Sequence, residues 1–108
     1  MKKVMISQPM KGLTDEQIKK VRVEAIEKLQ ADGYEVVDNF FTDVPEVKNI
    51  PLYHLAKSIL MLADCDALYM CEGWTKARGC LIEYECAVKY GIKVFIPEHD
   101  KTRQQDKE

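Results

Sequence analysis

Short apolar segments alternate with amphipathic helical segments along the whole chain, and this alternation limits the possible folds more than any other feature. Four apolar segments predict strands, at residues 3–7, 34–38, 65–71 and 92–96. Three segments with helical spacing lie between them, from Thr14 to Gly33, from Pro51 to Ala63 and over residues 80–90. Because strands joined through helices pair in parallel by right-handed crossovers, we predict an α/β fold. The expected architecture is a three-layer α/β/α sandwich, Rossmann-like or flavodoxin-like, with a four-stranded, mainly parallel sheet.

The length and composition are typical of one domain. The chain has 108 residues, of which 46% are hydrophobic and 31% are charged, as in ordinary globular proteins. We assign residues 1–97 to the domain and residues 98–108 to a polar, flexible C-terminal tail. No apolar run reaches the ~18 residues that a membrane-spanning helix needs, so we expect a cytoplasmic protein without a membrane partner.

Charge and cysteine usage argue against two further classes of function. Sixteen Lys and Arg against eighteen Asp and Glu give a net charge of -2, which removes the electrostatic attraction on which polynucleotide binding depends. The four cysteines form no C-x-x-C pair, and the two histidines lie at spacings that suggest no zinc site. We expect free thiols, no metal and no organic cofactor.

The first predicted helix carries a clear start signal. Thr14 and Gln17 match a capping box, in which the threonine oxygen and the glutamine amide satisfy free amides of the first turn. Apolar residues then recur at helical spacing, and we expect them on the inner face: Ile18, Val21, Ala25, Ile26 and Leu29.

The loops that follow the strands are the places to look for a binding site. In a parallel sheet, ligands bind beyond the carboxyl ends of the strands, where the strand order reverses. These loops are residues 7–12, 38–41 and 72–79. The first contributes Ser7, Gln8, Met10 and Gly12 as candidate substrate-binding residues. For Ser7 and Gln8, hydrogen bonding within the local turn is the alternative.

The junction between the third strand and the third helix is the richest of these segments. Gly79 allows close approach of the backbone to a ligand, and free amides at the helix start attract an anionic group. Glu83 and Glu85 stand two residues apart, which separates them by about 200° around the helix axis. Only one of them can face solvent freely. The alternative is that both are partly exposed surface residues.

The same junction resembles a known family. The pattern Gly79-x-x-x-Glu83-x-x-x-Ala87-x-x-x-Gly91, followed by a strand, looks like a signature of the nucleoside 2-deoxyribosyltransferase superfamily, which includes the 2'-deoxynucleoside 5'-phosphate N-hydrolases. Residues 63–67 (ADCDA) and 4–12 (VMISQPMKG) resemble its strand entrance and its first ligand-facing loop. Residues 6–10, 51–58 and 73–80 look more closely like a small bacterial and phage branch, known chiefly as a domain of unknown function. The resemblance covers about residues 3–97.

The resemblance implies glycosyl chemistry in which a glutamate attacks C1' of a (deoxy)nucleoside or nucleotide. By position this glutamate is Glu83, and water or a second base then resolves the covalent glycosyl-enzyme. The hydrolase branch has an aspartate where this chain has Ala56, and a phosphate-binding serine where it has Ala77. Asp38 is the candidate replacement acid, although capping a turn is an equal alternative.

Several neighbouring residues have more than one possible role. Arg78 is expected to contact phosphate or base together with Gly79, and Lys76 is an alternative phosphate ligand. Trp74 has three alternatives: stacking on the base, packing within its loop, or meeting another subunit. Cys80 near a helix start is an alternative nucleophile with a lowered pKa. Tyr53 and His54 open the second helix, where family members place substrate-facing side chains; a helix-face or interface role is the alternative.

These features together predict a nucleoside or nucleotide N-glycosidase or deoxyribosyltransferase that acts at C1' through Glu83. Its partner is a small nucleoside or nucleotide. Proteins that resemble this chain are commonly homo-oligomers, so we expect a dimer or a larger assembly. Two alternatives stay open: a nucleotide-binding or sensing module that has lost turnover, and a phage or mobile-element accessory protein whose surface binds a host partner.

Overall fold

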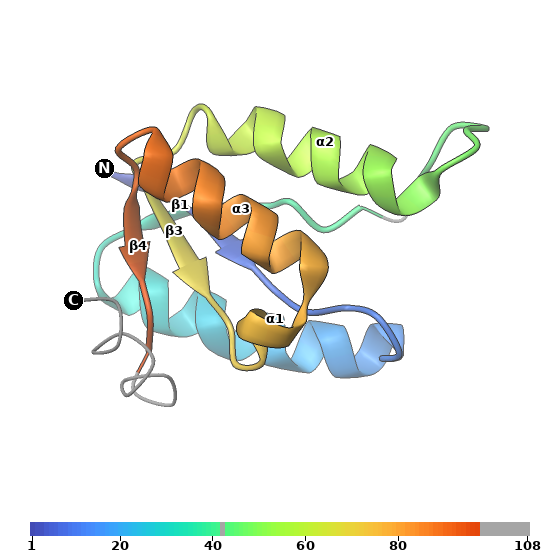
Figure 1. The fold of residues 1–108 in the computed structure, drawn as a ribbon. Helices are drawn as coiled ribbons and strands as arrows, with labels where there is room; N and C mark the ends of the chain where they lie inside the picture. The colour runs from blue at the N-terminus through green and yellow to red at the C-terminus, as the bar shows by residue number, and fades with distance from the viewer. Residues whose placement is uncertain (42, 98–108) are drawn as a thin grey trace.

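The computed structural model describes residues 1–41 and 43–97, and it shows a sheet with helices on both faces (Figure 1). The strands are β1 (Lys3–Ser7), β2 (Glu35–Val37), β3 (Ala67–Met70) and β4 (Lys93–Phe95). The helices are α1 (Asp15–Ala31), α2 (Ile50–Leu62) and α3 (Arg78–Lys89), with a short 3-10 helix, η1 (Trp74–Lys76), before α3. The predicted α/β sandwich is confirmed. The predicted tail, residues 98–108, lies outside the described residues.

The strand order of the sheet is β2-β1-β3-β4, and every pair of neighbours is parallel. The chain runs outward from β1 to β2 and then returns to the other side of β1 to form β3. The order therefore reverses between β1 and β3. Their carboxyl ends are aligned, with Ser7 opposite Met70. Ligands bind at such a reversal in open α/β sheets, so a binding site is expected beyond these two residues.

The two central strands alternate their side chains between the two faces of the sheet. Helix α1 covers one face, and α2 and α3 cover the other (Figure 1). The core on the α1 side is formed by Val4, Ile6, Ala25, Leu29, Ala67, Tyr69 and Cys71. The core on the α2 and α3 side is formed by Met5, Leu62, Leu68, Met70, Trp74, Cys80 and Ala87. Ser7 continues the alternation of Met5, which directs it toward α3.

The predicted capping box of α1 is present, but one predicted inner position is wrong. The Gln17 backbone N–H donates to Thr14 Oγ1 at 3.1 Å, and the Thr14 backbone N–H donates to Gln17 Oε1 at 2.9 Å. Val21, expected to face inward, is 41% exposed, whereas Arg22 is 5% exposed. The buried stripe therefore includes positions 18, 22, 25 and 29, which follow helical spacing with a charged residue among them.

Helix α2 begins with a side-chain cap and carries much of its apolar surface outward. The Leu52 backbone N–H donates to Asn49 Oδ1 at 3.0 Å, and a proline lies in the first turn. The buried residues of α2 are Ser58 and Leu62, while Leu52 and Leu60 are exposed.

Within the described ranges, no helix combines the length and apolarity that crossing a membrane takes.

Candidate functional site

Glu83 lies on α3 with its carboxyl group turned toward the end of β1. It is 7% exposed, and the Ser7 hydroxyl donates a hydrogen bond to Glu83 Oε1 at 2.5 Å. Ser7 itself is fully buried. Glu85, two residues further along α3, is exposed and forms an ion pair with Lys89 at 3.5 Å. The structure therefore separates the two glutamates, with Glu83 inside at the strand-order reversal and Glu85 outside.

The surroundings of Glu83 change its acidity. Burial is the largest influence, and it raises the pKa of the Glu83 carboxyl group because the charged form loses its hydration. The Ser7 and Ser58 hydroxyl groups oppose this shift as hydrogen-bond donors. Among the described residues, no lysine, arginine or histidine forms an ion pair with Glu83. A buried carboxyl group with a shifted pKa and no counterion is a candidate nucleophile or proton-transfer group.

The start of α3 leaves room beside its first turn. Ala77 occupies the cap position and contributes no side-chain hydrogen bond to the free amides of the helix. A Cβ atom at Gly79 would meet no other atom within 4 Å. Arg78 is exposed at the first helical position. These features place open space, free amides and a guanidinium group one turn before Glu83.

The loop after β1 is the second wall of this region. Gln8 is 8% exposed, and its Nε2 donates to the Ile18 carbonyl oxygen at 2.6 Å, so this side chain is bonded to α1 rather than within its own turn. The backbone then turns at Met10 and Gly12, which are both exposed. Gly73, with φ of +87°, lies beside this loop. A Cβ atom at Gly73 would lie 3.6 Å from Pro9 Cγ. The loops after β1 and β3 therefore lie against each other.

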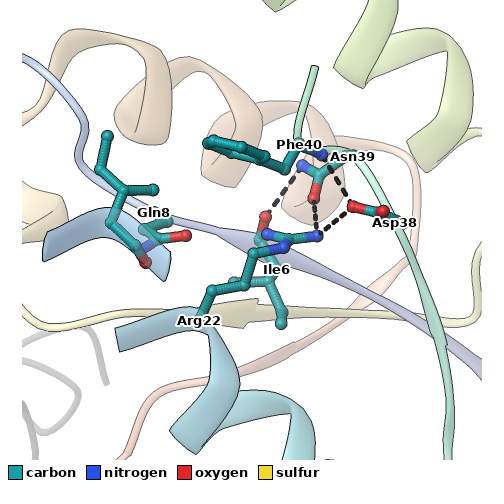
Figure 2. A network of polar contacts seen from close by, with 7 residues as sticks. Ile6, Gln8, Arg22, Asp38, Asn39 and Phe40 are labelled. Atoms are coloured by element: carbon teal, nitrogen blue, oxygen red, sulfur yellow. Dashed lines mark hydrogen bonds and ion pairs between the residues drawn. The ribbon is translucent and has the colours of Figure 1, made fainter. Parts of the chain in front are cut away.

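A separate polar cluster surrounds Arg22 on the α1 side (Figure 2). Arg22 Nη2 donates to Asp38 Oδ1 at 3.1 Å and to Asn39 Oδ1 at 2.9 Å. Asn39 Nδ2 in turn donates to the Ile6 carbonyl oxygen at 2.9 Å. The Phe40 backbone N–H donates to Asp38 Oδ1 at 3.0 Å, which is a turn cap. Asp38 therefore caps a turn and pairs with Arg22, and none of these contacts connects it to Glu83.

Comparison with models of protein families identifies one family that matches the chain. The model of a family described as "Domain of unknown function (DUF4406)" matches residues 2–96. The chain belongs to the DUF4406 family. A search of curated proteins finds no match to it. The match spans all the strands and helices described above, so the region around Glu83 lies within the DUF4406 domain.

Two candidate roles in this DUF4406 domain are corrected by burial. Trp74 is 1% exposed and its ring centroid lies 4.8 Å from that of Tyr84. Its ring packs in the core, so it presents no open face on which a base could stack. Burial raises the pKa of Cys80 to about 11 and that of Cys71 to about 12. The alternative of Cys80 as an activated nucleophile is therefore wrong, because a thiol with that pKa stays protonated at neutral pH.

Sequence reasoning missed one residue beside Glu83, Ser58, and two residues of the separate cluster, Arg22 and Asn39. Ser58 is a buried polar residue on a mostly apolar helix, and its position opposite Glu83 depends on how α2 packs on α3. Arg22 and Asn39 were missed because hydrophobic periodicity passes over charged and amide residues. The helical stripe at 18, 22, 25 and 29 is the signal that identifies Arg22. No comparable signal identifies Asn39, which lies in a loop.

The surface of the DUF4406 domain has two notable hollows. One of about 460 Å³ lies between α1 and β3 and is lined by Val21, Glu24, Ala25, Lys28, Tyr69, Cys71 and Glu72. The other, of about 240 Å³, lies between α2 and α3 and is lined by Ile59, Leu62, Ala63, Cys65, Cys86, Tyr90 and Ile92. Glu83 lines neither hollow.

Among the residues that the structure describes, no group of three His, Cys, Asp or Glu side chains is arranged to hold a metal ion.

Proposed function

We propose that this DUF4406 protein cleaves or transfers the N-glycosidic bond of a (deoxy)nucleoside or nucleotide, with Glu83 as the nucleophile at C1'. Membership of the nucleoside 2-deoxyribosyltransferase superfamily is part of this proposal. One observation carries it: a buried carboxyl group without a counterion is held at the end of β1 by the Ser7 hydroxyl. The signature-like spacing from Gly79 to Gly91 supports the same residue.

The electrostatics of Glu83 fit this chemistry. Cleavage of an N-glycosidic bond passes through a transition state in which the sugar carries positive charge. A carboxylate that lacks a counterion in the resting protein interacts more strongly with this transition state than with the neutral sugar. Such a difference in interaction is what accelerates a reaction. Ser7 orients the attacking carboxylate and keeps it ionised more readily than burial alone allows.

The start of α3 supports a nucleotide rather than a bare nucleoside. Free backbone amides at a helix start attract anions, and Ala77 does not cap them. Arg78 is exposed beside them, and Gly79 leaves open space. A 5'-phosphate would bind here while the sugar lies over Glu83, one turn further along α3.

We also propose a homo-oligomer. Large apolar side chains are exposed on α2 and at the end of α3, among them Leu60 at 74% and the C-cap residue Tyr90 at 83%. Tyr90 also lines the hollow between the two helices. Sedimentation at micromolar protein concentration tests this expectation directly, and a strictly monomeric protein would contradict it.

A nucleotide-binding module without turnover is the second candidate function. Position 56, where the hydrolase branch has an acid, is an exposed alanine on α2. Asp38, the candidate replacement, is bonded to Arg22 and to the turn at Phe40. A protein that keeps the nucleotide site but lacks a proton donor would bind without cleaving.

The deciding experiment measures free base released from a panel of deoxynucleosides and their 5'-monophosphates. We expect release by the wild-type protein and a loss of at least about 10³-fold in Glu83→Gln, as for removal of a nucleophile. Glu85→Gln is the matched control, because it removes an exposed carboxylate from the same helix. Thermal stabilisation by a panel member without base release would favour the binding module. If the protein neither releases base nor is stabilised by any member of the panel, both functions are contradicted.

A further inference from the structure

We propose that His54 is the general acid that protonates the departing base, an inference that rests on the glycosyl-transfer function proposed above. A base that leaves without a proton carries the electron pair of the broken bond as a negative charge, which makes it a poor leaving group. A positioned acid removes that charge in the transition state. The groups already described do not supply this acid, since Asp38 is bonded elsewhere and the thiol of Cys80 is buried.

The position of His54 on α2 brings it to the side of Glu83. His54 precedes Ser58 by four residues within α2, so the two side chains share one face of the helix, with Cβ atoms about 5–6 Å apart. The Ser58 hydroxyl lowers the pKa of the Glu83 carboxyl group, so this face of α2 is turned toward Glu83. His54 is therefore one helical turn from Ser58, on the side of α2 nearer the carboxyl edge of the sheet, where its ring meets Phe41.

Ring contacts hold His54 in a defined orientation. Its ring stacks on that of Phe41, with centroids 6.2 Å apart and planes 28° apart, and it meets Tyr53 edge-on at 6.2 Å. Phe41 belongs to the loop after β2, one of the loops at the carboxyl edge of the sheet. Lys57 approaches the Phe41 ring at 4.4 Å from the same helix. Within residues 1–41 and 43–97, neither ring nitrogen of His54 takes part in a hydrogen bond, so both are available to a substrate.

The proposed step is balanced in atoms and charge. A Glu83 carboxylate oxygen forms a bond to C1' as the bond from C1' to the base nitrogen breaks, and its electron pair moves to the base. His54, in its protonated form, transfers one ring N–H proton to the base, which leaves as a neutral molecule. Water then attacks C1', its proton returns to the His54 imidazole, and the Glu83 carboxylate is released. In transfer, a second base replaces this water.

Leaving-group dependence distinguishes a general acid from a packing residue. The variant is His54→Phe, which keeps a ring against Phe41, and the control is Leu52→Ala, an exposed position on the same helix. The substrates are two deoxynucleoside 5'-monophosphates whose bases are guanine and 7-methylguanine. The methylated base already carries a positive charge and leaves as a neutral molecule without a proton. If the panel identifies pyrimidines as substrates, uracil and the better leaving group 5-fluorouracil replace this pair.

We expect His54→Phe to lower kcat/KM for the guanine substrate by about 10²-fold or more, the usual contribution of a general acid. The expected loss for 7-methylguanine is within about threefold, because this base needs no proton. Both rates are measured on the same preparation, so partial unfolding cancels in their ratio; His54→Gln serves as a second variant. Equal losses on both substrates overturn the role of His54 while Glu83 chemistry stands. If the wild-type protein releases base from neither of these substrates and from no member of the panel of deoxynucleosides and 5'-monophosphates, the proposed function itself fails.

Discussion

Two buried charged residues lie on opposite faces of the same sheet, and their surroundings differ in kind. Arg22 on α1 is 5% exposed, and Glu83 on α3 is 7% exposed. Arg22 has an acidic partner, Asp38, at 3.1 Å and a buried amide partner, Asn39, at 2.9 Å. Glu83 has hydroxyl groups for partners, from Ser7 and Ser58, and no ion pair among the described residues.

This difference in surroundings distinguishes a structural role from a chemical one. A buried ion with a counterion and hydrogen bonds is stabilised in the resting protein, and Arg22 uses the two bonds of Nη2 to tie α1 to the loop after β2, while its Nη1 has no partner among the described residues. Asn39 extends that connection to the Ile6 carbonyl oxygen of β1. A buried carboxyl group without a counterion remains costly until a cationic species arrives. We therefore assign a structural role to Arg22 and a chemical role to Glu83, and three substitutions test this division.

Arg22→Met is expected to have the largest effect on folding. It removes the donor to the buried Asn39 oxygen and the partner of Asp38, so the free energy of unfolding should fall by about 3 kcal/mol. Urea unfolding measures this loss. Lys20→Met, an exposed position on the same helix, is the control, and its effect should stay within about 0.5 kcal/mol. An Arg22→Met protein as stable as the control would show that the Arg22 cluster is not architectural.

Ser7→Ala is expected to have the second largest effect, because it removes a donor to a buried, ionisable group. At neutral pH we expect a loss of about 2 kcal/mol in the free energy of unfolding, the scale of a hydrogen bond to a charge. In a Glu83→Gln background the same substitution should cost only about 1 kcal/mol, since the acceptor is then neutral. A double-mutant cycle by urea unfolding measures the difference. Strict additivity would mean that Ser7 and Glu83 are not coupled.

The same contrast explains how far the sequence could predict the structure. The strands and helices were predictable because short apolar runs and helical spacing report burial directly, and the capping box at Thr14 is a local signal. Topology rules direct attention to the carboxyl ends of the central strands, and Ser7 and Glu83 meet there, while Glu83 lines neither of the two hollows. The inward position of Glu83 was only one of two alternatives, since spacing shows that Glu83 and Glu85 diverge but not which one faces the sheet.

The rest of the site depends on packing between distant segments. Ser7 and Glu83 are 76 positions apart, and their contact requires α3 to cross the end of β1. Trp74 stands in a loop of polar composition, yet η1 turns its ring into the core against Tyr84. Burial of Arg22 requires the partners Asp38 and Asn39, which follow it by 16 and 17 positions. Hydrophobic patterns do not report polar partners of this kind.

The smallest expected effect is the pH dependence that Glu83 gives to stability. Burial raises the pKa of Glu83 above 4.5, so near this pH the folded protein binds a proton at Glu83 more tightly than the unfolded chain does. The stability that protonation contributes is fully present below pH 4.5 and is lost as the pH rises through the raised pKa. Glu83→Gln cannot ionise, so at neutral pH we expect it to be more stable than the wild-type protein by roughly 1 kcal/mol.

Urea unfolding at acidic and neutral pH measures this gain, which should disappear at acidic pH. Glu85→Gln, which replaces an exposed carboxylate, is the control and should not show a gain that appears only at neutral pH. A Glu83→Gln protein that is less stable than the wild type at neutral pH would contradict the expectation. It would mean that the carboxylate is already compensated in the resting protein, as Arg22 is. The cationic transition state would then gain little from Glu83, and the division between the two faces of the sheet would fail.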